Sequence, residues 1–364
     1  MELAPLTPRV ALDTSPLYVT RAGVARYIEG LLKGFAGIDR KGCEITPFAW
    51  EVENHDYRQP WRSLKTLYRE VFWASMVAPR ALRNQGVDLL HSTGVPIINV
   101  PRSIGHVVTL HDLAPVRHPE RFRRWHLAST RRGFGMTRKA DKVICISQFT
   151  ADEAIGLLDL DPRRLEVIHQ ASEWCAHPPE NPQPPALDLP DDFFLFVGTL
   201  EPGKNLHLLR EVYELAGQMG IQLPPLVVVG VRREGVQNEG GSPSTRSWVY
   251  AGRVSDNELA WLYSRSRALV FPSKYEGFGI PLLEAMAMRC PVICSRVASL
   301  GEVGGDTVLY ADLTPESYLD ALSRLLESDS LRNELIAGGL EQCRKFSWEK
   351  NASQLIDVYR SIAG

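Results

Sequence analysis

The sequence contains no hydrophobic run of the length that a membrane-spanning helix needs. Its longer apolar runs, such as Phe193–Val197 and Leu226–Val229, fall far short of the about 20 residues that cross a bilayer. The N-terminus also lacks the basic start and the apolar stretch of a secretory signal. We therefore expect no transmembrane segment and a cytoplasmic location.

A large excess of charge of either sign is absent as well. The formal net charge is −2 at pH 7, which argues against a globally basic nucleic-acid binder. Apolar residues make up 44% and charged residues 23% of the chain, as in ordinary soluble globular proteins. The chain is therefore expected to bury a normal hydrophobic core and to bind no nucleic acid.

Cysteine is scarce, and its six residues are scattered along the chain. Cys145 and Cys294 lie in apolar, strand-like runs, so we expect buried free thiols in a reducing compartment. Cys290 and Cys294 are spaced for neither a Cys-x-x-Cys redox site nor a zinc knuckle. The cysteines therefore predict no metal site.

The length of 364 residues predicts two domains at about 150 residues each. Residues 178–190 contain six prolines and no apolar periodicity, which is typical of a linker. We therefore expect an N-terminal domain over residues 1–177 and a C-terminal domain over residues 191–347.

Short β-rich runs alternate with helical patterns on both sides of this linker, as in parallel βαβ units. The expected strands are Arg9–Leu12, Leu89–His91, His106–Leu110, Lys142–Ile146, Leu165–Ile168, Phe193–Val197, Pro225–Val229, Trp248–Ala251, Ala268–Phe271 and Val292–Cys294. The apolar residues of Gly23–Phe35 repeat at helical spacing. Ligands of such sheets bind beyond the carboxyl ends of the strands, so the candidate sites are the loops there.

The loop after Ala268–Phe271 combines glycines, a helix start and two carboxylates. Gly277 and Gly279 let the backbone approach a ligand, and the first amides of the following helix favour an anion such as phosphate. Glu276 and Glu284 flank this site, where carboxylates can accept hydrogen bonds from paired sugar hydroxyls. The alternative is a pair of solvated surface charges, but the combination favours a nucleotide-sugar site.

The loop after Phe193–Val197 nearly matches a phosphate-binding P-loop. Asn205 follows Lys204 where a P-loop has the Ser or Thr that binds Mg²⁺, and the next strand ends in Gly230 instead of an aspartate. Both departures argue against an NTPase. The glycine turn at Gly198 with Lys204 still predicts a diphosphate cradle, and a tight turn with an exposed lysine is the alternative.

The N-terminal half offers one histidine and one helix start at strand ends. His111 and Asp112 follow the strand His106–Leu110, where an imidazole can hydrogen-bond a hydroxyl or move a proton. A structural histidine that holds the loop is the alternative. The amides at Gly23 face the same edge of the expected sheet.

Residues 117–139 contain eight Lys or Arg residues against the single acid Glu120. Aromatic residues are interleaved with them, so this face is expected to meet anionic lipid or a pyrophosphate-bearing acceptor through Arg121, Arg123 and Arg124. A solvated helix face is the alternative.

Together these loops resemble those of the retaining glycosyltransferases of family 4, also called group 1, which have the GT-B fold. The resemblance covers nearly the whole chain, and its most specific block looks like the family's Glu-x₇-Glu motif. The blocks that carry it are Thr109-Leu-His-Asp112, Phe196-Val-Gly-Thr-Leu-Glu-Pro-Gly-Lys204, Ser273-Lys-Tyr-Glu-Gly-Phe-Gly-Ile-Pro-Leu-Leu-Glu284 and Phe346-Ser-Trp-Glu-Lys350. It implies an α/β chain of two doubly wound Rossmann-like domains facing across an interdomain cleft, with the last helix, about 348–364, crossing back onto the N-terminal domain.

The resemblance also implies roles for individual residues. Lys204 would stabilise charge on the departing diphosphate and Glu276 would bind the sugar hydroxyls, while Glu284 would bind the ribose and His111 would touch the donor sugar near its anomeric carbon. The further donor contacts that it implies are Gly23, Val24, Thr199, Arg253, Gly277, Phe278, Gly279 and Ile280.

One position departs from the family pattern. The family often has an arginine directly after the first glycine of the diphosphate loop or just before its lysine, where this chain has Thr199 and Gly203. Either Arg253 substitutes for that arginine, or donor binding is weaker.

The implied reaction moves a hexose from a nucleotide diphosphate sugar to a hydroxyl of a glycan or of a lipid-pyrophosphate-linked acceptor, with retention of configuration. The loops most resemble those of bacterial mannosyltransferases of polysaccharide assembly, which implies GDP-mannose as donor. The basic segment 117–139 adds the expectation of a peripheral position at the cytoplasmic membrane face. No cofactor or metal is expected, because Asp159-Leu-Asp161 precedes a proline and is interpreted as a turn. A non-catalytic sugar-nucleotide or lipid-binding protein of the same fold and a P-loop-like NTPase are the alternatives.

Overall fold

The computed structural model describes residues 7–18, 23–40, 42–50, 68–231 and 248–363. The chain divides into two compact units: unit 1 comprises Met1–Gln170 with Trp348–Gly364, and unit 2 comprises Ala171–Ser347. The division precedes the proline-rich segment 178–190 that we expected to be the linker. That segment belongs to unit 2, where the Gln183 amide donates a hydrogen bond to the Asn257 carbonyl at 3.3 Å.

Unit 1 contains a parallel sheet of six described strands in the order β2-β1-β3-β4-β5-β6. The strands are β1 (Arg9–Asp13), β2 (Glu44–Phe48), β3 (Leu89–Ser92), β4 (Gly105–Leu110), β5 (Lys142–Cys145) and β6 (Leu165–Val167). The helices are η1 (Ser15–Tyr18), α1 (Gly23–Gly37), η2 (Tyr68–Val77), α3 (Ala78–Asn84), α4 (Ala114–Arg117), η3 (Pro119–Arg121), α5 (Arg124–Thr137), α6 (Gln148–Leu158), η4 (Pro162–Arg164) and α13 (Trp348–Ala363).

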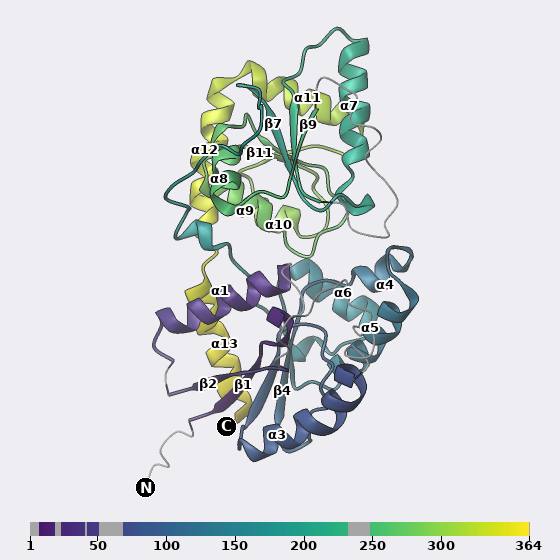
Figure 1. The fold of residues 1–364 in the computed structure, drawn as a ribbon, viewed down its shortest axis with the longest axis vertical. Helices are drawn as coiled ribbons and strands as arrows, with labels where there is room; N and C mark the ends of the chain where they lie inside the picture. The colour runs from purple at the N-terminus through teal and green to yellow at the C-terminus, as the bar shows by residue number, and fades with distance from the viewer. Residues whose placement is uncertain (1–6, 19–22, 41, 51–67, 232–247, 364) are drawn as a thin grey trace. The chain divides into compact units, whose positions relative to one another are not determined.

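The two faces of this sheet are covered by different helices (Figure 1). Ala11 and Leu90 point to the face that packs against η2 and α3, where Trp73 and Leu82 are buried. Because side chains alternate along a strand, their neighbours point to the opposite face, which α1 and α13 cover together. The indole of Trp348 occupies the space beside Gly30 of α1, where a Cβ would lie 2.0 Å from it, so the last helix is tightly packed in unit 1.

Unit 2 repeats the arrangement with a parallel sheet of six described strands in the order β12-β11-β10-β7-β8-β9. The strands are β7 (Phe194–Val197), β8 (Leu226–Val229), β9 (Trp248–Gly252), β10 (Leu269–Phe271), β11 (Val292–Cys294) and β12 (Leu309–Tyr310). The helices are η5 (Glu173–Cys175), η6 (Pro202–Lys204), α7 (Leu206–Gln218), α8 (Asp256–Arg265), α9 (Ile280–Ala287), α10 (Leu300–Gly304), α11 (Pro315–Glu327) and α12 (Asp329–Cys343). Helices α7 and α11 pack against one face, and α8 and α9 lie together on the other (Figure 1).

The expected α/β fold is confirmed, and each of the ten expected strands is present. Two strands at the sheet edges were missed. Strand β2 contains Pro47 and buries only Phe48 fully, and β12 is two residues long, so neither has the apolar run of a central strand. Edge strands are paired on one side only and are more exposed, so their sequences have a weaker hydrophobic pattern.

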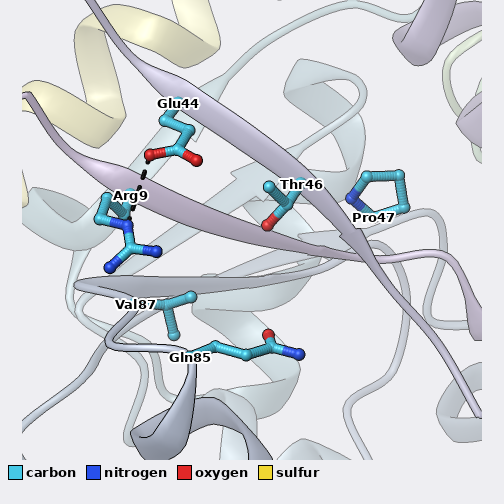
Figure 2. Close-up of a pocket in the computed structure, with 6 residues that line it drawn as sticks. All are labelled: Arg9, Glu44, Thr46, Pro47, Gln85 and Val87. Atoms are coloured by element: carbon cyan, nitrogen blue, oxygen red, sulfur yellow. Dashed lines mark ion pairs between the residues drawn. The ribbon is translucent and has the colours of Figure 1, made fainter.

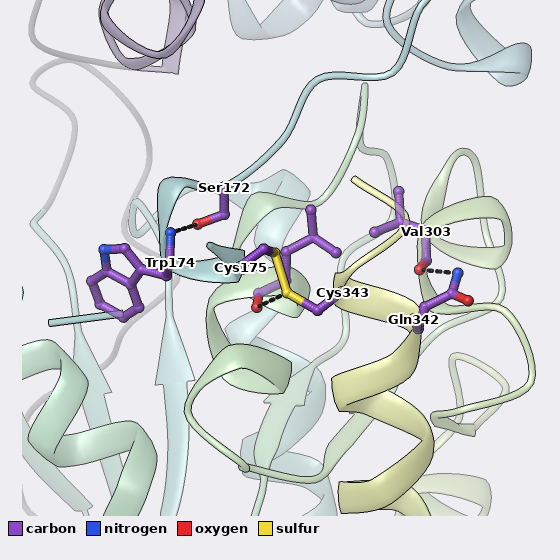
Figure 3. Close-up of a disulfide and its surroundings, with 7 residues drawn as sticks. Ser172, Trp174, Cys175, Val303, Gln342 and Cys343 are labelled. Atoms are coloured by element: carbon purple, nitrogen blue, oxygen red, sulfur yellow. Dashed lines mark hydrogen bonds between the residues drawn. A yellow bond between two sulfur atoms is a disulfide. The ribbon is translucent and has the colours of Figure 1, made fainter. Parts of the chain in front are cut away.

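The expectation of six free thiols is wrong for two cysteines. Cys175, at the end of η5, and Cys343, at the end of α12, form a disulfide (Figure 3). They are 168 residues apart in sequence, so only the fold brings them together. Cys43, Cys145, Cys290 and Cys294 are free and buried. Cysteine usage therefore does not support a reducing compartment.

Within the described residues, no helix combines the length and the hydrophobicity that crossing a bilayer requires.

Candidate active site

The glycine-rich loop between β10 and α9 lies at the carboxyl end of the second sheet. Gly279 has a φ of 114°, which side chains other than glycine rarely adopt, and it immediately precedes the first residue of α9, Ile280. The hydroxyl of Ser299 lies 2.9 Å from the Glu276 carbonyl and 2.8 Å from the Phe278 carbonyl, and it holds the loop against α10. The first amides of α9 are thereby held in place to bind an anion.

The loop between β7 and α7 meets this glycine-rich loop. The Lys274 amide donates a hydrogen bond to the Gly203 carbonyl at 2.8 Å. At the end of β8, Gly230 has a φ of 142°, and a Cβ there would lie 1.9 Å from the Gly198 carbonyl oxygen. Glycine is therefore required at position 230 for the end of β8 and the loop between β7 and α7 to pack closely.

Lys204 and Glu276, taken from these two loops, form an ion pair. Their side chains are 18% and 12% exposed, so the pair is mostly shielded from water. The Lys204 ammonium also lies 5.2 Å from the centre of the Phe271 ring, and its methylene groups lie beside Gly198. The sequence predicted that this cation and this carboxylate lie at the same end of the sheet. The structure shows that they are in contact.

Glu284, in the middle of α9, is 3% exposed. The hydroxyl of Tyr263, on α8, donates a hydrogen bond to its Oε2 atom at 3.3 Å. The surface-charge alternative does not apply to this glutamate, because its side chain is buried and hydrogen-bonded.

Thr199 and Arg253, the remaining candidates of unit 2, are both exposed. Arg253 follows the edge strand β9, which is separated from β7 by β8. Thr199 lies in the loop between β7 and α7, directly after Gly198. Both residues therefore lie beyond the carboxyl ends of the strands of the second sheet, but on loops that follow different strands.

His111 of unit 1 lies at the carboxyl end of β4. Its Nε2 atom lies 2.8 Å from the Thr93 carbonyl, which only accepts hydrogen bonds, so Nε2 carries the proton in the neutral ring. Burial lowers the pKa of His111 below its usual value, and the hydrogen bond to Thr93 opposes that effect. The Tyr27 ring packs edge-on at 4.9 Å between centroids and fixes the orientation of the imidazole.

The start of α1 lies at the same edge of the first sheet. Gly23 is exposed, with no heavy atom of its surroundings within 4 Å of where a Cβ would be, and Val24 packs near Gly94. Asp112, the neighbour of His111, accepts a hydrogen bond at 2.9 Å from the amide of Ala114, the first residue of α4. Asp112 thus has a structural role in addition to any contact with a substrate.

The sequence interpretation missed Asp13, which ends β1 at this edge. It is 7% exposed, and its Oδ1 accepts a hydrogen bond from the Ser15 amide at 3.0 Å. Burial raises the pKa of Asp13, an effect that its hydrogen bonds to Ser15 and the charge of Arg69 oppose. The sequence pattern that could have indicated Asp13 is an acidic residue directly after an apolar, strand-like run.

Comparisons with known proteins agree with this geometry. The family model described as "Glycosyltransferase Family 4" matches residues 21–171, and the model "Glycosyl transferases group 1" matches residues 179–342. The chain is 34% identical to O-antigen chain mannosyltransferase B of Escherichia coli, with 94% of each chain covered. The chain belongs to glycosyltransferase family 4.

A second relative and a solved structure are consistent with this assignment. The chain is 28% identical to a D-inositol 3-phosphate glycosyltransferase of Nocardioides, over 95% of this chain and 78% of the relative. Sucrose-phosphate synthase from Thermosynechococcus elongatus superimposes with a TM-score of 0.71 at 19% identity, over 97% of this chain and 98% of that one. This structural likeness shows the GT-B fold, and the family shows that the protein is a transferase enzyme.

The basic segment of this glycosyltransferase divides into two parts in the structure. Arg117, Arg132 and Arg138 bind protein groups: the Glu153 carboxylate, the Glu70 carbonyl with the Ser75 hydroxyl, and the Leu158 carbonyl, respectively. At the start of α5, by contrast, Arg123 and Arg124 are exposed, and Arg121 is partly exposed. Trp125 beside them is 54% exposed.

A surface pocket of about 270 Å³ in unit 1 lies away from the candidate residues (Figure 2). It is lined by Arg9, Glu44, Thr46, Pro47, Gln85 and Val87. Arg9 and Glu44, which form an ion pair at 3.3 Å, are the first residues of β1 and β2. The pocket is therefore at the amino ends of the strands, opposite the edge where ligands of such sheets bind.

Proposed function

We propose that this glycosyltransferase moves mannose from GDP-mannose to a hydroxyl of a glycan or of a lipid-pyrophosphate-linked acceptor, with retention of configuration. The ion pair between Lys204 and Glu276 beside the start of α9 is the observation that carries the proposal. The identity of 34% to an E. coli mannosyltransferase supports the choice of sugar.

The three groups at the carboxyl end of the second sheet suit three parts of such a donor. Lys204 and the first amides of α9 suit the diphosphate, because the ammonium group and the helix start both offer positive charge to an anion. Glu276 can accept hydrogen bonds from sugar hydroxyls, and the buried Glu284 can accept them from the ribose. We propose Arg253 and Thr199 as further contacts of the phosphates.

The proposed reaction proceeds on one face of the sugar. The bond between the anomeric carbon and the phosphate oxygen breaks, and the acceptor oxygen bonds to the same face of that carbon. The acceptor proton passes to the departing phosphate oxygen. Negative charge grows on the diphosphate during this step, so the preorganised Lys204 and the α9 amides lower the barrier.

His111 contributes a neutral ring to the proposed mechanism. Its protonated Nε2 is held by the Thr93 carbonyl, so its Nδ1 atom is the acceptor in this tautomer. We propose that this atom receives a hydrogen bond from a hydroxyl of the donor sugar, and that Gly23 and Val24 approach the distal phosphate.

The start of α5 is the proposed contact for the acceptor or for anionic lipid. Arg121, Arg123 and Arg124 with the exposed Trp125 combine positive charge with an aromatic ring, as interfacial segments do. With this contact we propose a peripheral position at the cytoplasmic face of the membrane. Sedimentation with vesicles of phosphatidylglycerol, compared with phosphatidylcholine, tests it, and equal binding of an R123A/R124A variant would contradict it.

A thermal-shift screen of nucleotide sugars tests the proposed donor. A ligand at 100 times its Kd raises the free energy of unfolding by about 2.7 kcal/mol, so GDP-mannose is expected to raise Tm more than UDP-glucose or GDP-glucose. The anomeric configuration of the mannosylated product, read by NMR, tests retention. Binding without any transfer would favour a non-catalytic protein of this fold instead.

A further inference from the structure

Glu284 is a buried carboxylate with a buried tyrosine as a hydrogen-bond donor. Tyr263 is 0% exposed and Glu284 is 3% exposed, and the phenol O–H of the first donates to Oε2 of the second at 3.3 Å. A carboxylate at such a depth is costly unless it is hydrogen-bonded. The hydrogen bond also restricts the rotation of the carboxylate plane about the last side-chain bond.

Tyr263 is itself held by groups outside the glycine-rich loop. The Trp174 ring packs edge-on against it at 5.9 Å between centroids, and the Ser266 hydroxyl donates to its backbone carbonyl at 3.1 Å. The residue after Trp174 is Cys175, whose disulfide to Cys343 ties η5 to the end of α12 (Figure 3). The phenol therefore has a fixed position from which to orient the carboxylate.

We propose that Tyr263 is a positioning residue that sets the orientation of Glu284 toward the ribose hydroxyls of the donor nucleotide. This inference rests on the proposed role of Glu284. An ionised carboxylate offers about four acceptor sites, and one of them is used by the phenol. The orientation that this bond imposes decides which of the others can accept from two neighbouring hydroxyls, so Tyr263 affects discrimination between ribose and deoxyribose.

The Tyr263→Phe variant tests the inference, because it keeps the ring against Trp174 and removes only the hydroxyl. Calorimetric titration gives the Kd values of GDP and 2′-deoxy-GDP. The wild-type preference for GDP is expected to fall by about tenfold in the variant, the usual effect of losing a hydrogen bond to a charged group. If GDP does not bind, UDP and 2′-deoxy-UDP serve equally, because the inference concerns the ribose.

Tyr213→Phe is the matched control. Tyr213 lies in unit 2, on α7, and its hydroxyl donates to the Pro224 carbonyl at 2.6 Å. Tyr213→Phe also removes one phenol oxygen and its hydrogen bond, so it shows how much this loss alone lowers the stability of unit 2. Its preference for GDP over 2′-deoxy-GDP should equal that of the wild type. A drop as large as that of Tyr263→Phe would overturn the inference.

Glu284→Gln separates the inference from the proposed function on which it rests. If this variant keeps the wild-type preference for GDP, then Glu284 does not bind the ribose and its proposed role fails. If Glu284→Gln loses the preference while Tyr263→Phe keeps it, only the positioning role fails. The inference predicts that both variants lose the preference and that the double variant loses no more than Glu284→Gln alone.

Trp174→Phe provides a second measurement if Tyr263→Phe does not fold. This variant retains the phenol and weakens the packing that holds it, so the preference for GDP should fall by a smaller factor. An unchanged preference together with a changed Tm would show that the ring only stabilises the fold, and it would contradict the inference.

Discussion

Lys204 and Glu276 form an ion pair across two loops that follow β7 and β10, although they are 72 residues apart in sequence. Hydrogen bonds hold the two loops: the Lys274 amide donates to the Gly203 carbonyl, and the Ser299 hydroxyl donates to the Glu276 carbonyl. The pair is thus set by the ends of two strands and does not depend on long, mobile side chains alone.

Removal of Glu276 should reduce transfer more than it reduces nucleotide binding. Glu276→Ala is expected to lower kcat/KM for the donor at least about 30-fold, because a contact to the sugar hydroxyls at the reacting centre is lost. The Kd of GDP, which has no sugar at that position, should change far less. Glu327→Ala, an exposed acid at the end of α11, is the control. Equal effects of Glu276→Ala on both constants would contradict the assignment.

Stability should decline as pH falls below about 6.5. Burial lowers the pKa of His91 to about 3 and that of His106 to about 4, from 6.5. The unfolded chain therefore binds protons at these residues before the folded chain does, and the free energy of unfolding decreases. The expected slope between pH 6.5 and 4 is about 1.4 kcal/mol per pH unit for each histidine.

Urea unfolding at several pH values measures this slope. His91 is held on both ring nitrogens, by Tyr359 at 2.6 Å and by Thr109 at 2.8 Å. His91→Asn should reduce the slope by about 1.4 kcal/mol per pH unit, the contribution of one histidine. His207→Gln, an exposed histidine on α7, should leave it unchanged. A wild-type slope near zero would contradict the neutral, buried state of these rings.

The disulfide predicts a definite thiol count. Protein purified without reductant should give four reactive thiols after denaturation and six after reduction, because Cys175 and Cys343 are paired. In the folded protein the thiols should react slowly, since burial raises the pKa of Cys43 to about 11 and that of Cys145 to about 12.

Reduction should also lower stability, by about 2–4 kcal/mol, because the bond closes a long loop. A C175S/C343S double variant is the matched control: its Tm should be lower than that of the oxidised wild type and should not respond to reductant. Six thiols in unreduced protein would contradict the pairing.

Transfer is expected to continue in the presence of excess EDTA. Positive charge at the diphosphate comes from Lys204 and from the α9 amides in the proposed mechanism, so no divalent ion is required. The rate with GDP-mannose should change less than about twofold on chelation, well below the effect of losing a charge-stabilising contact. Loss of activity that is restored by Mg²⁺ or Mn²⁺ would overturn this part of the proposal.

The sequence was most informative about the central strands and the loops that follow them. Apolar runs such as Leu226–Val229 are buried on both faces and therefore have a clear pattern, and the residues after them fall at one sheet edge. The edge strand β2 has no such pattern, because its residues are mostly exposed. The local hydrophobic pattern thus predicts the central strands of each sheet and the loops that follow them.

Contacts between distant segments were not predictable in this way. The disulfide joins residues separated by 168 positions, and Tyr263 reaches Glu284 from a different helix. The sequence pattern specifies which residues face a core or an edge, but the pairing of side chains depends on how the helices pack on the sheet. The orientation of Glu284 and the buried partners of His91 are therefore properties of the folded chain.

The steady-state kinetics of Lys204→Ala measure how much the Lys204 ammonium contributes to transfer from the proposed donor. Lys274→Ala is the matched control, because Lys274 is an exposed lysine of the neighbouring loop. We expect kcat/KM for mannosyl transfer from GDP-mannose to fall at least about 30-fold in Lys204→Ala, equivalent to about 2 kcal/mol of lost transition-state stabilisation, and to stay near the wild-type value in Lys274→Ala. A Lys204→Ala enzyme with a kcat/KM within about twofold of the wild type would show that Lys204 does not stabilise the departing diphosphate.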